Sequence, residues 1–205
     1  CSRNSGRKRS NFNRNRNHMS KIEIVASFFG ILAIVLEIFE NAWTWLFGIL
    51  SAAIYVYICY QVGLYADVQL QFVYIIVFIY GWYQWIKGGD THQGVRITYL
   101  ELKPFLFINI AAIIVWLVYA KLMSVYQTQF VYLDTFITIF CLVGLYFLAK
   151  KNMQNWYYWA IVNPLAIFMF WQKGLPATAI LSGVNFVLGL YGWIVWRKRY
   201  KLQNA

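Results

Sequence analysis

Two tryptophans and an asparagine lie at helical spacing inside an apolar run of this sequence. The segment W-Y-Y-W-A-I-V-N-P, residues 156–164, places Trp156, Trp159 and Asn163 at positions i, i+3 and i+7 of one helix face. Two flat indoles and an amide could stack an aromatic ring and bind a carboxamide or a hydroxyl. Pro164 lacks a backbone N–H, so it should bend the helix and free a carbonyl at the same depth.

A buried amide without a partner costs about 1–3 kcal/mol, so Asn163 must meet a ligand, water or another helix. The alternative interpretation is an inter-helix hydrogen bond for Asn163 and an interfacial position for Trp156. The span-end tryptophans are predicted to be interfacial as well. They are Trp43, Trp45, Trp85, Trp193 and Trp196.

The elements that carry these residues are predicted to be membrane-spanning helices. The 205 residues are 61% hydrophobic, 20% aromatic and only 12% charged, whereas soluble domains have about 25% charged residues. The apolar blocks are about 16–22 residues long, which suits helices that cross a bilayer. We therefore predict an all-α integral membrane protein with seven transmembrane helices. They span about 22–39, 43–60, 68–86, 104–122, 132–149, 155–172 and 177–196.

The net charge of +11 comes largely from residues 1–18, which hold six basic residues and no acid. This segment is interpreted as a disordered basic leader, possibly non-native, and not as a secretory signal or a nucleic-acid-binding arm. Cys1, Cys59 and Cys141 have no disulfide or metal-site spacing, and His18 and His92 form no metal motif. No cofactor is expected.

Basic residues in the short loops predict the orientation. One side holds three after Met19, namely Lys21, Lys121 and Lys173. The other side holds nine: Lys87, Arg96, Lys103, Lys150, Lys151, Arg197, Lys198, Arg199 and Lys201. We therefore expect a multi-pass protein of a bacterial inner membrane, with the N-terminus outside and the C-terminus in the cytoplasm.

The chain repeats itself at an offset of 111 residues. Y-G-W-x-x-W-x-K at residues 80–87 recurs at 191–198, and Q-V-G-L at 61–64 recurs as Q-K-G-L at 172–175. This predicts two parallel three-helix repeats, 20–88 and 131–199. They are separated by a loop and a linking helix within 89–130 and followed by a cytoplasmic tail, 200–205. The 3+1+3 plan is similar to that of the SWEET sugar transporters, in which a substrate site is expected between the repeats.

Polar positions occur at matching places in the third helix of each repeat. Gln71 and Tyr74 correspond to Ser182 and Asn185. Each pair is interpreted as ligand contacts or as inter-helix hydrogen bonds. The Tyr80-Gly81 and Tyr191-Gly192 pairs are expected to permit close helix packing.

The predicted spans contain almost no full charge. No lysine or arginine lies at mid-span to bind a phosphate. Glu37, about one turn from its helix end, comes closest to being a charged residue inside a span. Whether Glu37 couples transport to protons is left open. The residues indicate an uncoupled carrier for an uncharged or cationic, aromatic, hydroxylated small molecule.

Four motifs together resemble the bacterial nicotinamide riboside transporters, the PnuC family. They are W-x-x-W-x-x-x-N at Trp156, Trp159 and Asn163, G-L-Y-A-D at 63–67, Y-G-W-Y-Q-W at 80–85 and Y-G-W-I-V-W at 191–196. The resemblance covers about residues 20–200. It implies a SWEET-like inner-membrane carrier that takes up nicotinamide riboside, a form of vitamin B3, by facilitated diffusion. A cytoplasmic kinase then phosphorylates the riboside, which traps it for NAD synthesis.

The predicted substrate-binding residues combine both arguments: Trp156, Trp159, Asn163, Asn185, Gln71, Tyr74 and Tyr80. Trp156 and a facing aromatic would stack on the pyridinium ring, and Asn163 would bind the carboxamide or a ribose hydroxyl. The alternatives are a carrier of another flat cationic vitamin such as thiamine, and a substrate-binding subunit of a multi-component importer. An intramembrane hydrolase is disfavoured, because Ser51 and Ser182 lack a base. Whether the chain forms a homo-oligomer is left open.

Overall fold

The computed structural model describes residues 22, 24–61, 65–89, 94–126 and 130–204. The basic segment 1–18 lies outside the described residues. The described residues form seven α-helices and one short 3-10 helix, with no strand beyond a single bridge. The helices are Ile24–Ile38, α2 (Trp43–Gln61), α3 (Tyr65–Lys87), α4 (Leu102–Met123), α5 (Val131–Ala149), α6 (Asn155–Gln172) and α7 (Pro176–Gln203).

The prediction of an all-helical chain with seven helices is confirmed, and the helix ends differ by a few residues. The α4 helix begins at Leu102, so Pro104 lies in its first turn, where a missing N–H costs no helical hydrogen bond. The α7 helix continues to Gln203. The predicted tail, 200–205, is therefore largely an extension of the last helix.

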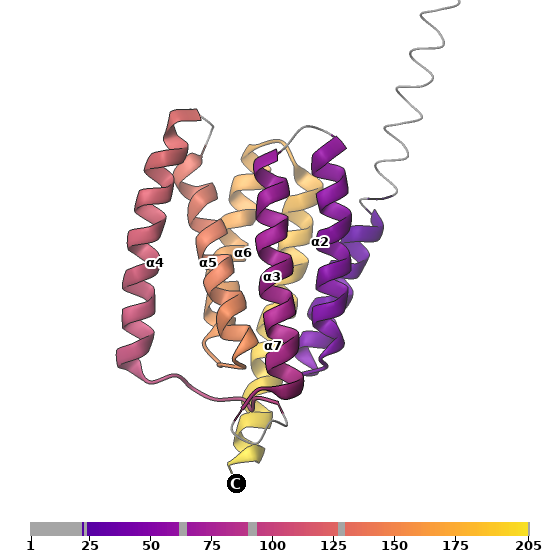
Figure 1. Ribbon diagram of the computed structural model, residues 1–205, viewed down its shortest axis with the longest axis vertical. Helices are drawn as coiled ribbons and strands as arrows, with labels where there is room; N and C mark the ends of the chain where they lie inside the picture. The colour runs from indigo at the N-terminus through magenta and orange to yellow at the C-terminus, as the bar shows by residue number, and fades with distance from the viewer. Residues whose placement is uncertain (1–21, 23, 62–64, 90–93, 127–129, 205) are drawn as a thin grey trace, which may run out of the picture.

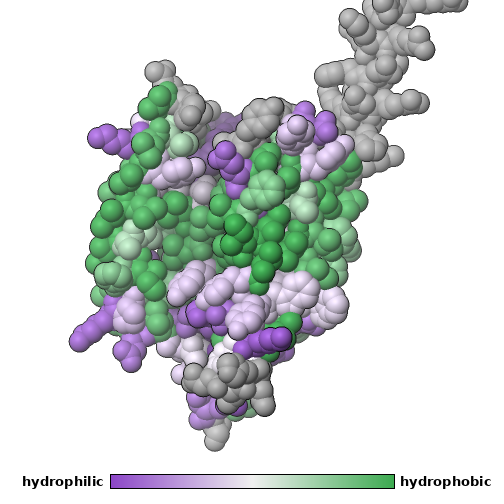
Figure 2. All heavy atoms as spheres, in the orientation of Figure 1, coloured by the Kyte–Doolittle hydropathy of each residue, from purple (hydrophilic) through white to green (hydrophobic). Residues whose placement is uncertain are grey.

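An apolar band crosses the face of the molecule shown in Figure 2, between two polar ends. Figure 2 shows hydrophobic residues across the middle and hydrophilic ones above and below. Among the described helices, α2, α4, α5 and the Thr178–Gln203 part of α7 are long and apolar enough to cross a bilayer. The sequence of α6 is rich in tryptophan and tyrosine and holds the Asn163-Pro164 pair. These residue types lower its mean hydropathy.

The helices pack as a bundle with α4 at its edge (Figure 1). The α2 helix packs on α3, α6 packs on both α5 and α7, and α3 packs on α5. Among the labelled α-helices, α4 makes its main contact with α5. It is also tied to α6, because the Tyr158 hydroxyl donates to Asn109 Oδ1 over 3.0 Å. Most of the α4 surface is exposed and apolar, as expected of a helix that faces lipid.

Two tryptophan–glycine contacts have the same form in the two halves of the chain. A Cβ atom at Gly81 would overlap the Trp45 ring, and one at Gly192 would overlap the Trp156 ring. Both glycines therefore let an indole lie directly against a helix backbone, as the Tyr-Gly pairs predicted. Each indole also meets a second one edge to face, at 5.4 Å for Trp45–Trp85 and 5.3 Å for Trp156–Trp196.

The prediction that the span-end tryptophans are interfacial is wrong for three of them. Trp45, Trp85 and Trp196 are buried in the core, whereas Trp43 is 56% exposed. The physical reason is that helix ends in this bundle converge at one pole, where two indole N–H groups find backbone carbonyls. Trp85 Nε1 donates to the Leu148 carbonyl over 3.1 Å, and Trp196 Nε1 donates to the Glu37 carbonyl over 3.2 Å.

The same pole carries an ion cluster between the two halves. Glu40 follows the helix Ile24–Ile38, and Lys151 follows α5; both have a positive φ, 56° and 49°. Lys151 Nζ lies 3.1 Å from Glu40 Oε2, and Arg199 donates to Glu40 Oε1 over 3.0 Å. Glu40 therefore links the end of the first helix to the α5–α6 turn and to α7.

A segment before α4 is fastened across this pole. The Thr98 backbone N–H donates to the Lys151 carbonyl, and the Met153 N–H donates to the Thr98 carbonyl. The Gln154 side chain both donates to and accepts from the Leu100 backbone, at 2.8 and 3.1 Å. We call residues 94–101 the strap. The strap follows α3 and is bonded to the α5–α6 turn, where Thr98 and Asn152 form an isolated parallel β-bridge.

Candidate substrate cavity

A cavity of about 370 Å³ lies in the middle of the bundle. Its volume falls in the range of small-molecule sites, roughly 300–1,000 Å³. The lining residues come from the first helix, α2 and α3 and from α5, α6 and α7, but not from α4. Helices from both halves of the chain therefore enclose one space.

Six of the seven predicted site residues line this cavity: Trp156, Trp159, Asn163, Asn185, Gln71 and Tyr74. Residues on α3, α6 and α7 are thus brought together around one volume, although the sequence separates them by up to 114 positions. Tyr80 is not among the lining residues. It packs against the tryptophan core, and the Lys150 ammonium lies 5.5 Å from the centre of its ring.

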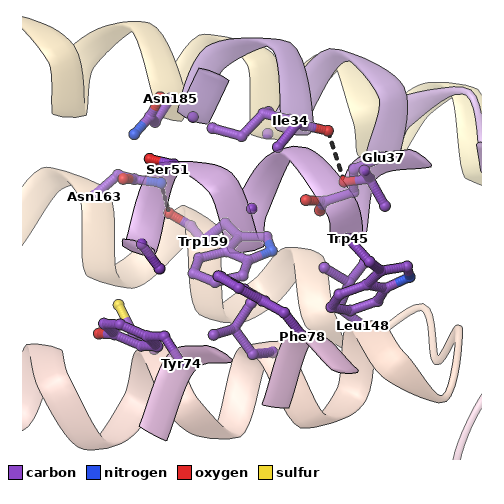
Figure 3. A pocket seen from close by; sticks show the side chains of 18 of the residues that line it. Ile34, Glu37, Trp45, Ser51, Tyr74, Phe78, Leu148, Trp159, Asn163 and Asn185 are labelled. Carbon is purple, nitrogen blue, oxygen red and sulfur yellow. Dashed lines mark hydrogen bonds between the residues drawn. The ribbon is translucent and has the colours of Figure 1, made fainter. Parts of the chain in front are cut away.

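The cavity has two chemically different ends. Figure 3 shows Asn163, Asn185 and Ser51 together at one end and Glu37, Trp45 and Leu148 at the other, with Trp159 between them. Tyr74 and Phe78 lie along the side, with their rings stacked at 6.2 Å and an interplanar angle of 15°. One end therefore presents amides and a hydroxyl, and the other presents an indole and a carboxyl group.

Several polar groups of the wall already have partners within the protein. Thr44 Oγ1 donates to the Ala33 carbonyl over 2.7 Å, and Ser51 Oγ donates to the Ala26 carbonyl over 2.9 Å. These bonds hold α2 against the first helix. They leave the two hydroxyl hydrogens unavailable to a ligand, because each hydroxyl has a single hydrogen to donate.

Other polar groups of the wall have no partner among the described residues. The unpaired buried atoms at the cavity are the indole nitrogens of Trp45, Trp156 and Trp159 and the amide oxygen of Asn185. A buried donor or acceptor without a partner is costly, so a polar molecule in the cavity that bonded to any of these atoms would be stabilised. Their presence around one space indicates a binding site.

Asn163 is partly satisfied by its own helix. Its Nδ2 donates to the Trp159 carbonyl over 2.9 Å, the dashed line beside Asn163 in Figure 3. Pro164 follows directly inside α6. The bond fixes the amide and uses one of its two N–H groups, so the second N–H and the oxygen remain for other partners. Inter-helix hydrogen bonding, the alternative interpretation of Asn163, is not what the described contacts show.

The sequence reasoning did not predict the other residues of the wall, among them Trp45, Phe78 and Tyr55. The repeat contained a signal for the first of them, because Trp45 corresponds to Trp156 at the offset of 111. Phe78 gave no such signal, since one phenylalanine among sixteen has no distinctive spacing.

Among the described residues that line the cavity there is no lysine and no arginine, and Glu37 is the one carboxylic acid. No group of three or more potential metal ligands occurs in the part of the chain that the structure describes. The site therefore has the groups to bind and orient a molecule, through rings, amides and one carboxyl group.

A central cavity walled by membrane-spanning helices from both halves of a chain is the arrangement of a small-molecule transporter. The chain belongs to the family described as nicotinamide mononucleotide transporters, whose sequence model matches residues 20–198. The resemblance to the PnuC-type transporters is thereby confirmed, and the protein is a transporter and not an enzyme.

Individual relatives agree with this assignment. The chain is 24% identical to the nicotinamide riboside transporter PnuC of Escherichia coli, over 87% of this chain and 85% of that protein. It is 26% identical to the PnuC of Neisseria mucosa, over 88% and 73%. The riboflavin/roseoflavin transporter RibM of Streptomyces davaonensis is 22% identical, over 87% and 85%. A crystal structure of the vitamin B3 transporter PnuC shares the fold, with a TM-score of 0.70, 23% identity and coverage of 94% and 86%.

Proposed function

We propose that this protein takes up nicotinamide riboside by facilitated diffusion and that a cytoplasmic kinase traps the riboside by phosphorylation for NAD synthesis. The observation that carries the proposal is the cavity with an amide end, an indole-carboxyl end and no basic residue in its described lining. The riboside combines a flat cationic ring, a carboxamide and ribose hydroxyls. Relatives named as nicotinamide riboside transporters support the same substrate.

The assignment to the riboside differs from the family description, which names the mononucleotide. A phosphate group needs lysine, arginine or backbone N–H donors as partners. No basic residue lines the cavity in the part of the chain that the structure describes. We therefore favour the uncharged ribose over its phosphate, which also makes phosphorylation an effective trap on the cytoplasmic side.

We infer that the chain has a 3+1+3 architecture in which residues 20–88 and 131–199 are parallel repeats. The matched contacts of Trp45 and Trp156 with glycines support this. We also propose that the pole carrying Glu40, Lys151 and the C-terminal part of α7 faces the cytoplasm, because basic residues collect there. In this arrangement Trp156, Trp159, Asn163, Asn185, Gln71 and Tyr74 bind the substrate between the repeats.

Calorimetry on the detergent-purified protein tests the proposal. Nicotinamide riboside, nicotinamide mononucleotide and thiamine are titrated into the wild-type chain and into Asn163→Leu. We expect binding of the riboside alone, and a loss of affinity of at least about tenfold in the variant. Uptake of the riboside into liposomes that contain only this protein tests the transport step, since a subunit of a multi-component importer would not transport alone.

Two results would contradict the proposal. Thiamine binding without riboside binding would keep the cavity and change the substrate. Unchanged riboside affinity in Asn163→Leu would assign that amide a packing role.

A second candidate function is the carriage of a different flat vitamin. A relative named as a riboflavin/roseoflavin transporter is nearly as similar to this chain as the PnuC relatives are. Overall identity therefore does not choose the substrate, and the choice depends on the residues of the wall. Riboflavin is neutral, so including it in the titration series separates this alternative from the cationic vitamins.

A further inference from the structure

Among the described residues of the cavity wall, Glu37 is the one carboxylic acid, and none is a lysine or an arginine. It lies in the last turn of the helix Ile24–Ile38. Its side chain faces the cavity from the end that also holds Trp45 (Figure 3). The electrostatic character of the site therefore depends on this one carboxyl group.

The Glu37 carboxyl group has no counter-charge among the described residues. The residue is 7% exposed, and no described hydrogen bond or ion pair involves its side-chain oxygens. Lys151 and Arg199 are both bound to Glu40, three residues further along the chain. A buried carboxylate without a partner costs several kcal/mol, so it favours either a proton or a bound cation.

Aromatic faces complete the surroundings of this group. Trp45 lies at the same end of the cavity, and Trp159 lies between that end and the amides of Asn163 and Asn185. Indole rings attract cations through their negative faces, most strongly where water is excluded. A carboxyl group beside two indoles in an enclosed space is therefore suited to a delocalised cation such as a pyridinium or thiazolium ring.

We propose that Glu37, Trp45 and Trp159 form a subsite for the positive charge of the substrate, and that Glu37 makes this carrier prefer cationic over neutral aromatic vitamins. This inference rests on the proposed function, because it assigns charge selectivity to the same cavity. The amide end then holds the uncharged polar part of the molecule. The substrate lies along the axis from Glu37 to Asn163, with its charged ring at the Glu37 end.

A matched pair of ligands isolates the charge. Nicotinamide riboside is a cation, whereas its dihydro form is neutral and has the same substituents on nearly the same frame. Calorimetry measures both ligands on the wild-type chain and on Glu37→Gln, which keeps the side-chain shape. We expect the wild type to bind the cation at least about tenfold more tightly than the neutral form, and the variant to reduce that ratio below about threefold.

Two further variants control the experiment. Glu40→Gln removes a carboxylate that lies outside the cavity wall, so it should keep the wild-type ratio. Glu37→Asp keeps the charge and should retain a preference for the cation. Binding of the neutral riboside by Glu37→Gln, together with an unchanged elution volume in gel filtration, shows that the variant is folded.

The inference is overturned if the wild type binds both forms equally, or if Glu37→Gln keeps the full preference for the cation. Failure of the proposed substrate gives a different result, because the wild type would then bind neither riboside. In that case thiamine and its neutral deaza isostere replace the two ribosides. The ratio of their affinities in the wild type and in Glu37→Gln then tests whether Glu37 selects the cation. A wild-type chain that binds neither cation contradicts both proposals.

Discussion

The indole of Trp196 donates its hydrogen to the backbone carbonyl of Glu37, over 3.2 Å and across 159 positions of the chain. The bond has a counterpart, because Trp85 donates in the same way to the carbonyl of Leu148. Trp196 follows Trp85 by 111 residues, and Leu148 follows Glu37 by 111 residues. The last helix of each half thus bonds to the first helix of the other half, and the two bonds hold one pole of the cavity together.

Removing either indole N–H should destabilise the protein. Trp196→Phe and Trp85→Phe keep an aromatic ring, but each removes a hydrogen bond between the two halves and makes a buried side chain smaller, at a cost of about 1–3 kcal/mol. The Glu37 and Leu148 carbonyls keep a backbone donor, from Glu40 and Lys151. Thermal unfolding in detergent measures the effect as a lower midpoint for each variant. Trp43→Phe is the control, since Trp43 is largely exposed and should change little. Equal midpoints for all three variants would show that the two hydrogen bonds contribute nothing.

A methyl group at Gly192 should disturb the Trp156 ring. An added Cβ there overlaps the indole, so Gly192→Ala requires the ring or the helix to move, at a cost of about 1–3 kcal/mol. Gly183→Ala on the same helix is the matched control. Its Cβ meets only Ile167 Cδ1 at 3.9 Å, so the better helix former should leave stability unchanged or raise it by up to about 1 kcal/mol. A neutral Gly192→Ala would contradict the close contact.

Two glutamines of α3 should differ in their effect on binding. Gln71 lines the cavity, whereas Gln69 is exposed on the surface. Gln71→Leu should weaken riboside binding by about 1–2 kcal/mol, because an amide that pairs with the ligand is replaced by an apolar group. Gln69→Leu should leave the affinity unchanged. Calorimetry on the two variants compares them directly, and an equal affinity in both would remove Gln71 from the site.

The Glu40 cluster should contribute modestly to stability. Glu40 and Lys151 are each 12% exposed in their side chains, and Arg199 is 37% exposed. Glu40→Gln should lower stability by about 1 kcal/mol, and the loss should shrink at high salt because partly exposed ion pairs are screened. A double-mutant cycle with Lys151→Met measures the coupling. Full additivity of the two losses would mean that the pair does not interact.

Much of the fold could be predicted from the sequence. Apolar runs of membrane-spanning length are separated by charged or proline-containing turns, such as Lys150-Lys151 and Lys173–Pro176, so the helices and their order follow from hydropathy. The helical spacing of Trp156, Trp159 and Asn163 similarly placed three residues on one cavity-facing side. These patterns are local, and helical periodicity is enough to interpret them.

The remaining features depend on contacts between distant segments. Trp45 and Trp85 have the position of interfacial tryptophans along the chain, and only the packing of their helices buries them. Tyr80 lies about half a helical turn from Phe78, so it faces away from the other α3 residues of the wall and packs against the tryptophan core. The strap gave no signal, because residues 94–101 have ordinary loop composition and are ordered by their partners in the α5–α6 turn.

The crossed indole bonds also have a consequence for the order of events during synthesis. The Glu37 carbonyl enters the membrane early, but its donor, Trp196, emerges when nearly the whole chain has been made. The Trp85 indole likewise has no acceptor until Leu148 follows it. A nascent chain that stops before α7 can form the Trp85–Leu148 bond but not the Trp196–Glu37 bond, so its first helix is not yet tied to the second half of the chain in this way. The hydrogen bond between the first helix and α7 therefore forms only after α7 has been made.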